Sequence, residues 1–361
     1  MGRRRFTRAV AVAAAVTVAA LVAPAGCGKG ARDHGPPPER AFYYWRTTLG
    51  LTTVEQHALG ELGVTRLYLR VFDVEWRADQ DGPATMGPIH LGDVAPALGD
   101  LEVVPVVYLR SDVFTHLPAA RTAELAAWTW REVGRRAAEL GFTVRELQLD
   151  CDWTDSTRDR FFAFVRELDA LVQPERVTLS ATIRLHQIKY RERTGVPPVA
   201  RGMLMFYNMG KFSPDPEARA IFDEDAARRY LARIDEYPLP LDAALPIWSW
   251  TIHLRDDVVE GLLQSTDPDE LADLDFVRPA GAARYVVTRT AFLHGTLLRE
   301  GDLLKVEVTG PRETQAAATM LATRLAPGRT PRTIALFDLS ERNLHRHGLD
   351  DLDHVFRTFR H

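Results

Sequence analysis

The chain has 361 residues, of which 46% are hydrophobic and 26% are charged, and its formal net charge is −4. This composition is typical of a globular protein, and the length suffices for one large domain. The slightly negative balance argues against nucleic acid as a partner, because a nucleic-acid-binding protein needs an excess of positive charge on one face.

The first residues predict an export signal. Arg3, Arg4 and Arg5 form a basic start, an apolar run over 9–23 follows, and small residues then lead to Cys27. The apolar run is too short for a comfortable membrane-spanning helix, so residues 1–26 are assigned to a signal peptide. We therefore expect the protein to be exported.

Ala25-Gly26-Cys27 resembles the lipobox of bacterial lipoproteins, which predicts lipidation of Cys27 and anchoring to a membrane of the cell envelope. Pro24 stands where that motif usually has leucine, so secretion without a lipid stays the alternative. Cys151 is the other cysteine, and a lipidated Cys27 leaves it without a disulfide partner.

Residues 27–40 have no apolar periodicity and predict a Pro-rich tether in front of a domain over 41–361. Eight runs in this domain predict strands: Phe42–Arg46, Arg66–Asp73, Glu102–Leu109, Arg145–Asp152, Thr178–Arg184, Met203–Asn208, Ala243–Trp248 and Thr333–Asp338. Five segments between them predict helices: Thr53–Leu62, Ala119–Leu140, Ser156–Leu171, Glu224–Tyr237 and Glu313–Leu325. Repeated strand–helix alternation predicts an α/β fold, a (β/α)8 TIM barrel.

Two connections break the alternation. The stretch 74–100 has little helical pattern. Between strands seven and eight lies an insertion, in which Tyr285–Leu293 and Leu303–Val308 alternate like an extra hairpin. We expect this insertion on the loop face of the barrel, where it either walls a cleft or merely covers an edge.

The fourth and fifth strands alternate between apolar and polar residues with a period of two. Gln148, Asp150 and Asp152 share one face of the fourth strand, and Arg184 and His186 continue the polar face of the fifth. The apolar face of each strand belongs against the outer helices, so the polar faces are expected to line the barrel interior.

Catalytic groups of such barrels come from the carboxyl ends of the strands. The inward positions there are occupied by Arg46, Tyr108, Arg110, Asp150, Asp152, Arg184, His186, Tyr207 and Trp248. Nearby lie Asp73, Glu75, Asn208, Trp250 and Asp338. Two carboxylates on one strand face repel each other and suit acid–base chemistry, although the Arg and Asp members could equally form an internal ion-pair network.

Aromatic residues gather at the same strand ends. Sugars present flat C–H faces that pack on aromatic rings, while Asp, Asn and Arg bond their hydroxyl groups. Trp248 and Tyr207 are expected in a sugar-binding cleft. Trp45 and Trp153 are expected to face outward, into the core under the helices.

Asp150-Cys151-Asp152-Trp153-Thr154 resembles the strand-four signature D-x-D-x-E of chitinase-like family 18 glycoside hydrolases. Met205-Phe206-Tyr207-Asn208 is similar to the strand-six motif of the same family. The resemblance implies a glycan ligand, Asp152 as the carboxylate that orients the substrate, Asp150 as its support, and Tyr207 with Asn208 as substrate contacts. The start Phe42-Tyr43-Tyr44-Trp45-Arg46 also resembles uncharacterised barrel lipoproteins of bacterial envelopes.

Thr154 stands where the family has its glutamate, which is the general acid. A hydroxyl group does not protonate a leaving group at neutral pH, so the family pattern is degenerate here. Our leading hypothesis is a glycoside-hydrolase-like envelope protein in which Asp73, Glu75 or Asp155 supplies the proton and Asp152 is the second carboxylate. The alternative is a glycan-binding lipoprotein that does not cut its ligand.

No cofactor is expected, because Gly-rich phosphate-binding loops, His-Glu-x-x-His and Gly-x-Ser-x-Gly motifs are missing from the sequence. His345 and His347 lie two apart beyond the last strand. They are expected in a surface loop rather than a metal site, since the sequence supplies no further ligands for them.

Overall fold

The computed structural model describes residues 37–92, 98–264, 266, 268–281, 283–325 and 331–360. The assigned signal peptide, Cys27 and the tether up to residue 36 lie outside these described residues. The first strand begins at Glu39, so Glu39 and Arg40, which we assigned to the tether, are part of the fold.

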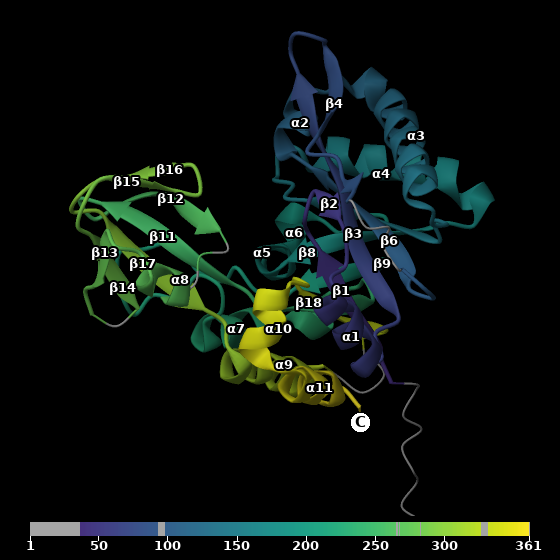
Figure 1. Ribbon diagram of the computed structural model, residues 1–361. Coiled ribbons are helices and arrows are strands. Elements are labelled where there is room, and N and C mark those ends of the chain that lie inside the picture. The colour runs from purple at the N-terminus through teal and green to yellow at the C-terminus, as the bar shows by residue number, and fades with distance from the viewer. Residues whose placement is uncertain are drawn as a thin grey trace, which may run out of the picture. The chain divides into compact units, whose positions relative to one another are not determined.

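Eight parallel strands form a closed barrel, as the sequence predicts (Figure 1). Their order is β1-β18-β10-β9-β8-β7-β6-β3, and pairing of β1 with β3 closes the ring. The bounds are β1 Glu39–Tyr44, β3 Arg66–Arg77, β6 Glu102–Leu109, β7 Glu146–Cys151, β8 Thr178–Arg184, β9 Arg201–Met205, β10 Leu241–Pro246 and β18 Thr333–Phe337. All eight predicted strands are therefore confirmed, with boundary shifts of a few residues.

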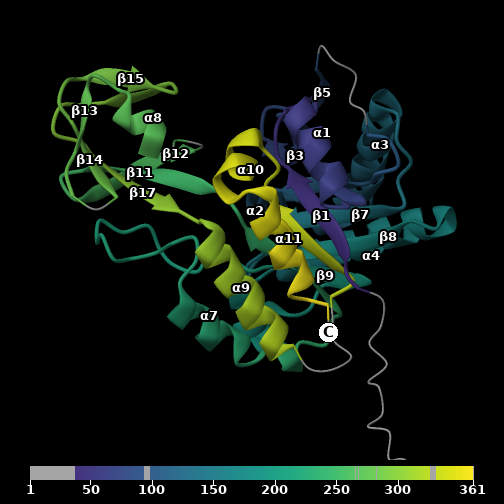
Figure 2. The same ribbon diagram turned by 60° about the horizontal axis from the view of Figure 1, so that its bottom comes forward.

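The long helices α3 and α4 each bury one apolar face. The α-helices are α1 Thr53–Glu61, α2 Ser111–His116, α3 Thr122–Leu140, α4 Arg158–Val172, α5 Leu185–Lys189, α6 Arg191–Thr194, α7 Glu224–Leu231, α8 Pro268–Ala272, α9 Pro311–Arg324, α10 Glu341–His347 and α11 Leu349–Arg357. Short 3-10 helices span η1 Ala119–Arg121, η2 Gln173–Glu175 and η3 Ile234–Glu236. Figure 2 shows α9 and α11 side by side.

Sequence signals explain where these helices begin and end. Thr52 caps α1 through a capping box with Glu55, and Gly141 ends α3 in the left-handed conformation. The five predicted helices all form, but the one predicted over Glu224–Tyr237 ends as α7 at Leu231 and is followed by the 3-10 turn η3. The shorter helices α2, α5, α6, α8, α10 and α11 were not predicted.

The connection after β3 is a strand extension and not a helix. β3 continues to Arg77 and pairs antiparallel with β4, Gly82–Met86, while β5, His90–Leu91, pairs with β2, Thr48–Leu49. The missing helical pattern of 74–100 reflects this hairpin.

The insertion between β10 and α9 carries a second sheet with its own hydrophobic cluster. Its strands are β11 Ser249–Arg255, β12 Val258–Gln264, β13 Val277–Pro279, β14 Arg284–Val287 and β17 Leu303–Val308, and β15 Ala291–Leu293 pairs with β16 Thr296–Leu298. The predicted hairpin segments do meet, since β14 pairs with β17, but Tyr285–Leu293 divides between β14 and β15.

Ion pairs fill the amino end of the barrel. Arg66 lies 2.9 Å from Glu146 and 3.0 Å from Glu102, and Arg332 joins Glu146 to Asp242 at 2.8 and 3.1 Å. Glu146 is buried, so its charge is stabilised by these partners. This end therefore serves stability, and the opposite end is left for a site.

Across the described ranges, no helix is long and apolar enough to cross a membrane.

Candidate functional site

A cluster of charged side chains lies at the carboxyl ends of the barrel strands, which we call the barrel mouth. Arg184 of β8 donates from Nη2 to Asp150 Oδ1 over 2.9 Å and from Nε to Asp152 Oδ1 over 2.5 Å. Thr182 donates to the same Asp150 oxygen over 2.6 Å. Asp150 is buried, whereas half of the Asp152 side chain is exposed. One guanidinium group thus pairs with two carboxylates at the end of the fourth barrel strand.

Burial raises the pKa of Asp150, and the neighbouring Arg184 works against this rise. Burial opposes the charge of Arg184, yet Asp150 and Asp152 raise the pKa of its guanidinium above the ordinary value. Exposed His186 lies beyond the pair, where desolvation lowers its pKa against the attraction of Asp152. The cluster is therefore an ion-pair network, which was one of the two alternatives predicted from the sequence.

Asp73 reaches the mouth because β3 is irregular. Val71 has no partner in the register between β3 and β6, and this β-bulge turns Asp73 to the side where Arg70 already points. Arg70 binds Asp73 at 2.6 Å and the Gly87 carbonyl at 3.1 Å. Asp73 is close enough to raise the pKa of Asp150 as well, whereas Glu75 lies 3.6 Å from Arg77.

Tyr108 of β6 borders the same carboxylates and is half-buried. Burial, followed by repulsion from Asp152 and Asp150, raises the pKa of Tyr108 to about 12. Its hydroxyl group therefore stays protonated at neutral pH and can donate to a ligand oxygen. Arg110 follows β6, is exposed, and pairs with Asp112 at 3.3 Å at the rim.

Aromatic rings form the other half of the mouth, around Phe337 at the end of β18. The Phe337 ring centroid lies 5.3 Å from Trp248, 5.6 Å from Tyr207 and 5.4 Å from Trp45. Tyr207 is buried, whereas Trp248, Trp45 and Phe337 are each half-buried. The partly exposed rings offer an apolar surface beside the charged cluster, which is the combination that suits a sugar.

The expected directions of Trp45 and Arg46 are wrong. Tyr43 points inward, since its hydroxyl donates to Gln148 Oε1 over 2.5 Å, so Trp45 two residues later also faces the interior. Arg46 has the opposite parity: it binds Glu55 of α1 at 2.7 Å and lies over the ring of Tyr44. Alternation along β1 therefore places Arg46 outside the barrel and Trp45 inside it.

Trp153 follows the expectation and is buried under the helices. Its ring stacks on Phe161 of α4 at 5.1 Å, and its Nε1 donates to the Thr194 carbonyl. Asn208 is exposed beside Tyr207 with a φ of 55°, a backbone conformation that asparagine tolerates. Trp250 is buried in the insertion, where its Nε1 donates to Glu307 over 3.2 Å.

The position of the family's general acid is filled by a local hydroxyl network. Thr154 Oγ1 lies 2.9 Å from Ser156 Oγ, and Thr157 Oγ1 accepts from the Thr154 amide over 2.9 Å. Asp155, one residue on, is exposed and pairs with Arg193 at 3.0 Å. Neither side chain places a free carboxyl group next to Asp152.

Phe337 and Trp45 are mouth residues that were not predicted from the sequence. Counting by two along the last predicted strand from Thr333 would have placed Phe337 inside.

In the part of the chain that the structure describes, no three His, Cys, Asp or Glu side chains are grouped to hold a metal ion. The surface loop expected at His345 and His347 is wrong, because both residues lie on α10. His347 is buried, and its Nε2 shares a hydrogen bond of 3.1 Å with Thr314 Oγ1.

No protein-family model and no curated protein matches the sequence. Among solved structures, the spore cortex-lytic enzyme SleL of Bacillus megaterium is 11% identical with a TM-score of 0.55, over 90% of this chain and 75% of that one. A chitinase of Chromobacterium violaceum is 12% identical with a TM-score of 0.51, over 89% and 98%. A family GH18 chitinase of Cycas revoluta, in complex with allosamidin, is 14% identical with a TM-score of 0.51, over 89% and 99%. The chain therefore has the TIM-barrel fold of family 18 chitinases and SleL, as the motif resemblance predicts.

Proposed function

We propose that the protein binds a glycan at the barrel mouth and does not cleave it. The observation that carries this proposal is the ion-pair network of Arg184 with Asp150 and Asp152. A guanidinium partner disfavours proton transfer to a carboxylate, whereas the carboxylate can still accept a hydrogen bond from a sugar hydroxyl group. Here Arg184 engages both Asp150 and Asp152. Thr154 adds no proton donor.

A sugar bound here would use both halves of the mouth. Its C–H face would pack on Phe337 and Trp248, and its hydroxyl groups would bond Tyr108 and the exposed part of Asp152. The chitinase fold and the allosamidin complex of one structural neighbour support a carbohydrate ligand. Asp73, Glu75, Arg110, His186 and Asn208 would line the surrounding rim.

We also propose that this binding takes place at the cell envelope. The assigned signal peptide would export the chain, and lipidation of Cys27 would anchor it through the tether. Globomycin, which blocks lipoprotein signal cleavage, should change the apparent mass of the wild-type protein in cells but not that of Cys27→Ala. Equal mass shifts in both would contradict the anchor and leave plain secretion.

Calorimetric titration with soluble fragments of chitin, peptidoglycan and cellulose tests the proposed binding, combined with an assay for new reducing ends. We expect saturable binding of at least one fragment without new reducing ends. A Thr154→Glu variant that gains turnover would place the lost activity at Thr154. Turnover by the wild type would contradict the proposal.

Hydrolysis is the second candidate function, and one observation favours it. Burial raises the pKa of Asp338 to about 6, and its Oδ1 accepts from Asn343 Nδ2 over 2.8 Å. A carboxyl group with such a pKa suits general acid catalysis near neutral pH. This candidate predicts reducing ends with the wild type and their loss in Asp338→Asn, with binding retained.

A further inference from the structure

A row of aromatic rings runs from the barrel mouth, through Trp250 of the insertion, to Phe212. Trp248 lies 5.3 Å from Phe337 and 6.1 Å from Trp250, and Trp250 lies 5.0 Å from Phe212. Trp250 is buried, but 41% of Phe212 is exposed. The row therefore begins and ends in partly exposed rings, at Phe337 and Trp248 in the mouth and at Phe212 outside it.

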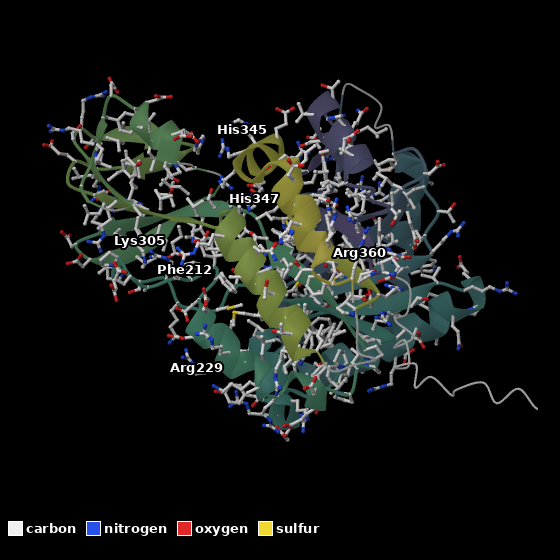
Figure 3. All side chains as sticks on the ribbon, turned by 90° about the horizontal axis from the view of Figure 1, so that it is seen from below. Phe212, Arg229, Lys305, His345, His347 and Arg360 are labelled. Carbon is white, nitrogen blue, oxygen red and sulfur yellow. The ribbon has the colours of Figure 1, made fainter. Side chains whose placement is uncertain are left out.

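Phe212 belongs to the loop 206–223 between β9 and α7, and this loop is pinned to the inserted sheet. Lys305 of β17 donates from Nζ to the carbonyls of Ser213, Asp215 and Ala218 over 3.2, 2.7 and 2.7 Å. Figure 3 shows Lys305 close to Phe212. The ammonium group is buried, so its full set of acceptors is what makes burial tolerable.

Glu307, two residues further on the same strand, completes the attachment. It lies 3.2 Å from Lys305, accepts from the Ala220 amide over 2.8 Å, and accepts from Trp250 Nε1 over 3.2 Å. A Cβ on Gly210 would come within 2.4 Å of the Arg219 carbonyl, so the two ends of the loop meet too closely for any other residue. These contacts fix the backbone of the loop that carries Phe212, whose ring packs against Trp250.

We propose that Phe212 is a second sugar-binding position, outside the barrel mouth, and that the ligand is a chain long enough to reach both. This inference rests on the proposed glycan binding and specifies the length of the ligand. A sugar unit at the mouth packs on Phe337 and Trp248, and a later unit of the same chain packs on Phe212. Lys305 and Glu307 act as positioning residues, because they fix the loop and touch no sugar.

The test measures affinity against ligand length. Soluble oligomers of chitin, peptidoglycan glycan strands and cellulose, from monomer to hexamer, are titrated into the full chain. We expect affinity to rise once the oligomer spans from the mouth to Phe212. Phe212→Ala should remove this gain, lowering the affinity of the longest oligomers by about tenfold and leaving that of the shortest unchanged.

Phe292→Ala is the matched control. Phe292 lies on β15, is 71% exposed, and makes no described contact with this row of rings. It should leave binding of every oligomer unchanged, and Phe212→Tyr should keep the length-dependent gain. Because Phe212 is exposed, its variants are expected to fold, which a thermal melt checks.

A rise of affinity with length that survives Phe212→Ala would overturn the second position, while the proposed binding at the mouth would stand. Equal affinity for short and long oligomers would do the same. If no oligomer binds, the proposed function itself fails, and this inference fails with it.

Discussion

Removing the Arg184 side chain tests whether its charge stabilises Asp150 and Asp152 at the barrel mouth. Arg184→Met keeps the length of the apolar stem but removes the charge that balances buried Asp150 and half-exposed Asp152. Breaking a buried ion pair by removing one partner costs about 3–5 kcal/mol, because the remaining charge stays desolvated. We expect a loss of this size in the free energy of unfolding, measured by urea denaturation at neutral pH.

The loss should depend on pH with a definite sign. Burial already raises the pKa of Asp150 in the folded protein, and without Arg184 this pKa rises further. A carboxyl group with a raised folded-state pKa destabilises the fold above that pKa and ceases to do so once it is protonated. The deficit of Arg184→Met should therefore shrink as the pH falls, and adding Asp150→Asn should relieve most of it.

Arg110→Met is the matched control, since Arg110 is exposed at the end of the neighbouring β6 and pairs with exposed Asp112. Its stability change should stay within about 0.5 kcal/mol. If Arg110→Met and Arg184→Met lost equal free energy of unfolding, or if the loss in Arg184→Met did not change with pH, Arg184 would not stabilise Asp150 and Asp152 as described.

Three further predictions concern the ion pairs at the amino end of the barrel, the aromatic rings of the mouth, and the insertion. Glu146→Gln should cost about 3–5 kcal/mol in urea unfolding, because Arg66 and Arg332 lose a buried partner, whereas Glu139→Gln on the exposed side of α3 should cost under about 1 kcal/mol. Phe337→Ala should weaken calorimetric glycan binding at least tenfold, since it removes the ring that Trp45, Tyr207 and Trp248 surround; unchanged affinity would rule out the mouth. Hydrogen bonds from Arg255 and His253, working against burial, lower the pKa of Asp302 to about 2. The stability that Asp302 gives the insertion is present above about pH 4 and lost as the pH falls toward 2. Hydrogen-exchange protection factors, which correct for the intrinsic exchange rate at each pH, should therefore fall in β11 and β17 over that range in the wild type and much less in Asp302→Asn.

Local patterns were enough to predict the barrel and part of its mouth. In strands with a period of two, such as the one that carries Asp150, the polar residues are predicted to point into the barrel, and the structure agrees there. The same reasoning failed for Trp45 and Arg46. Both residues lie just past the end of β1, and the parity of that strand was not tied to a residue of known direction.

Other features depend on partners that are distant in sequence. The ion pair of Arg70 with Asp73 needs a β-bulge, which shifts the alternation and leaves no clear mark in the sequence. The sheet of the insertion joins β11 to β17, and the loop before α7 is held by Lys305. The local alternation predicts a hairpin in this region, but it carries no information about which distant segments pair.

In the proposed function, the barrel mouth binds a glycan and does not cut it. The most direct measurement is a calorimetric titration of the wild type with an oligomer of the chitin, peptidoglycan or cellulose series at saturating concentration. The oligomer is then recovered from the calorimeter cell and its mass is measured. Binding without cleavage predicts a saturable binding isotherm and an oligomer of unchanged length. An oligomer recovered in shorter pieces, or no binding in any series, would contradict it.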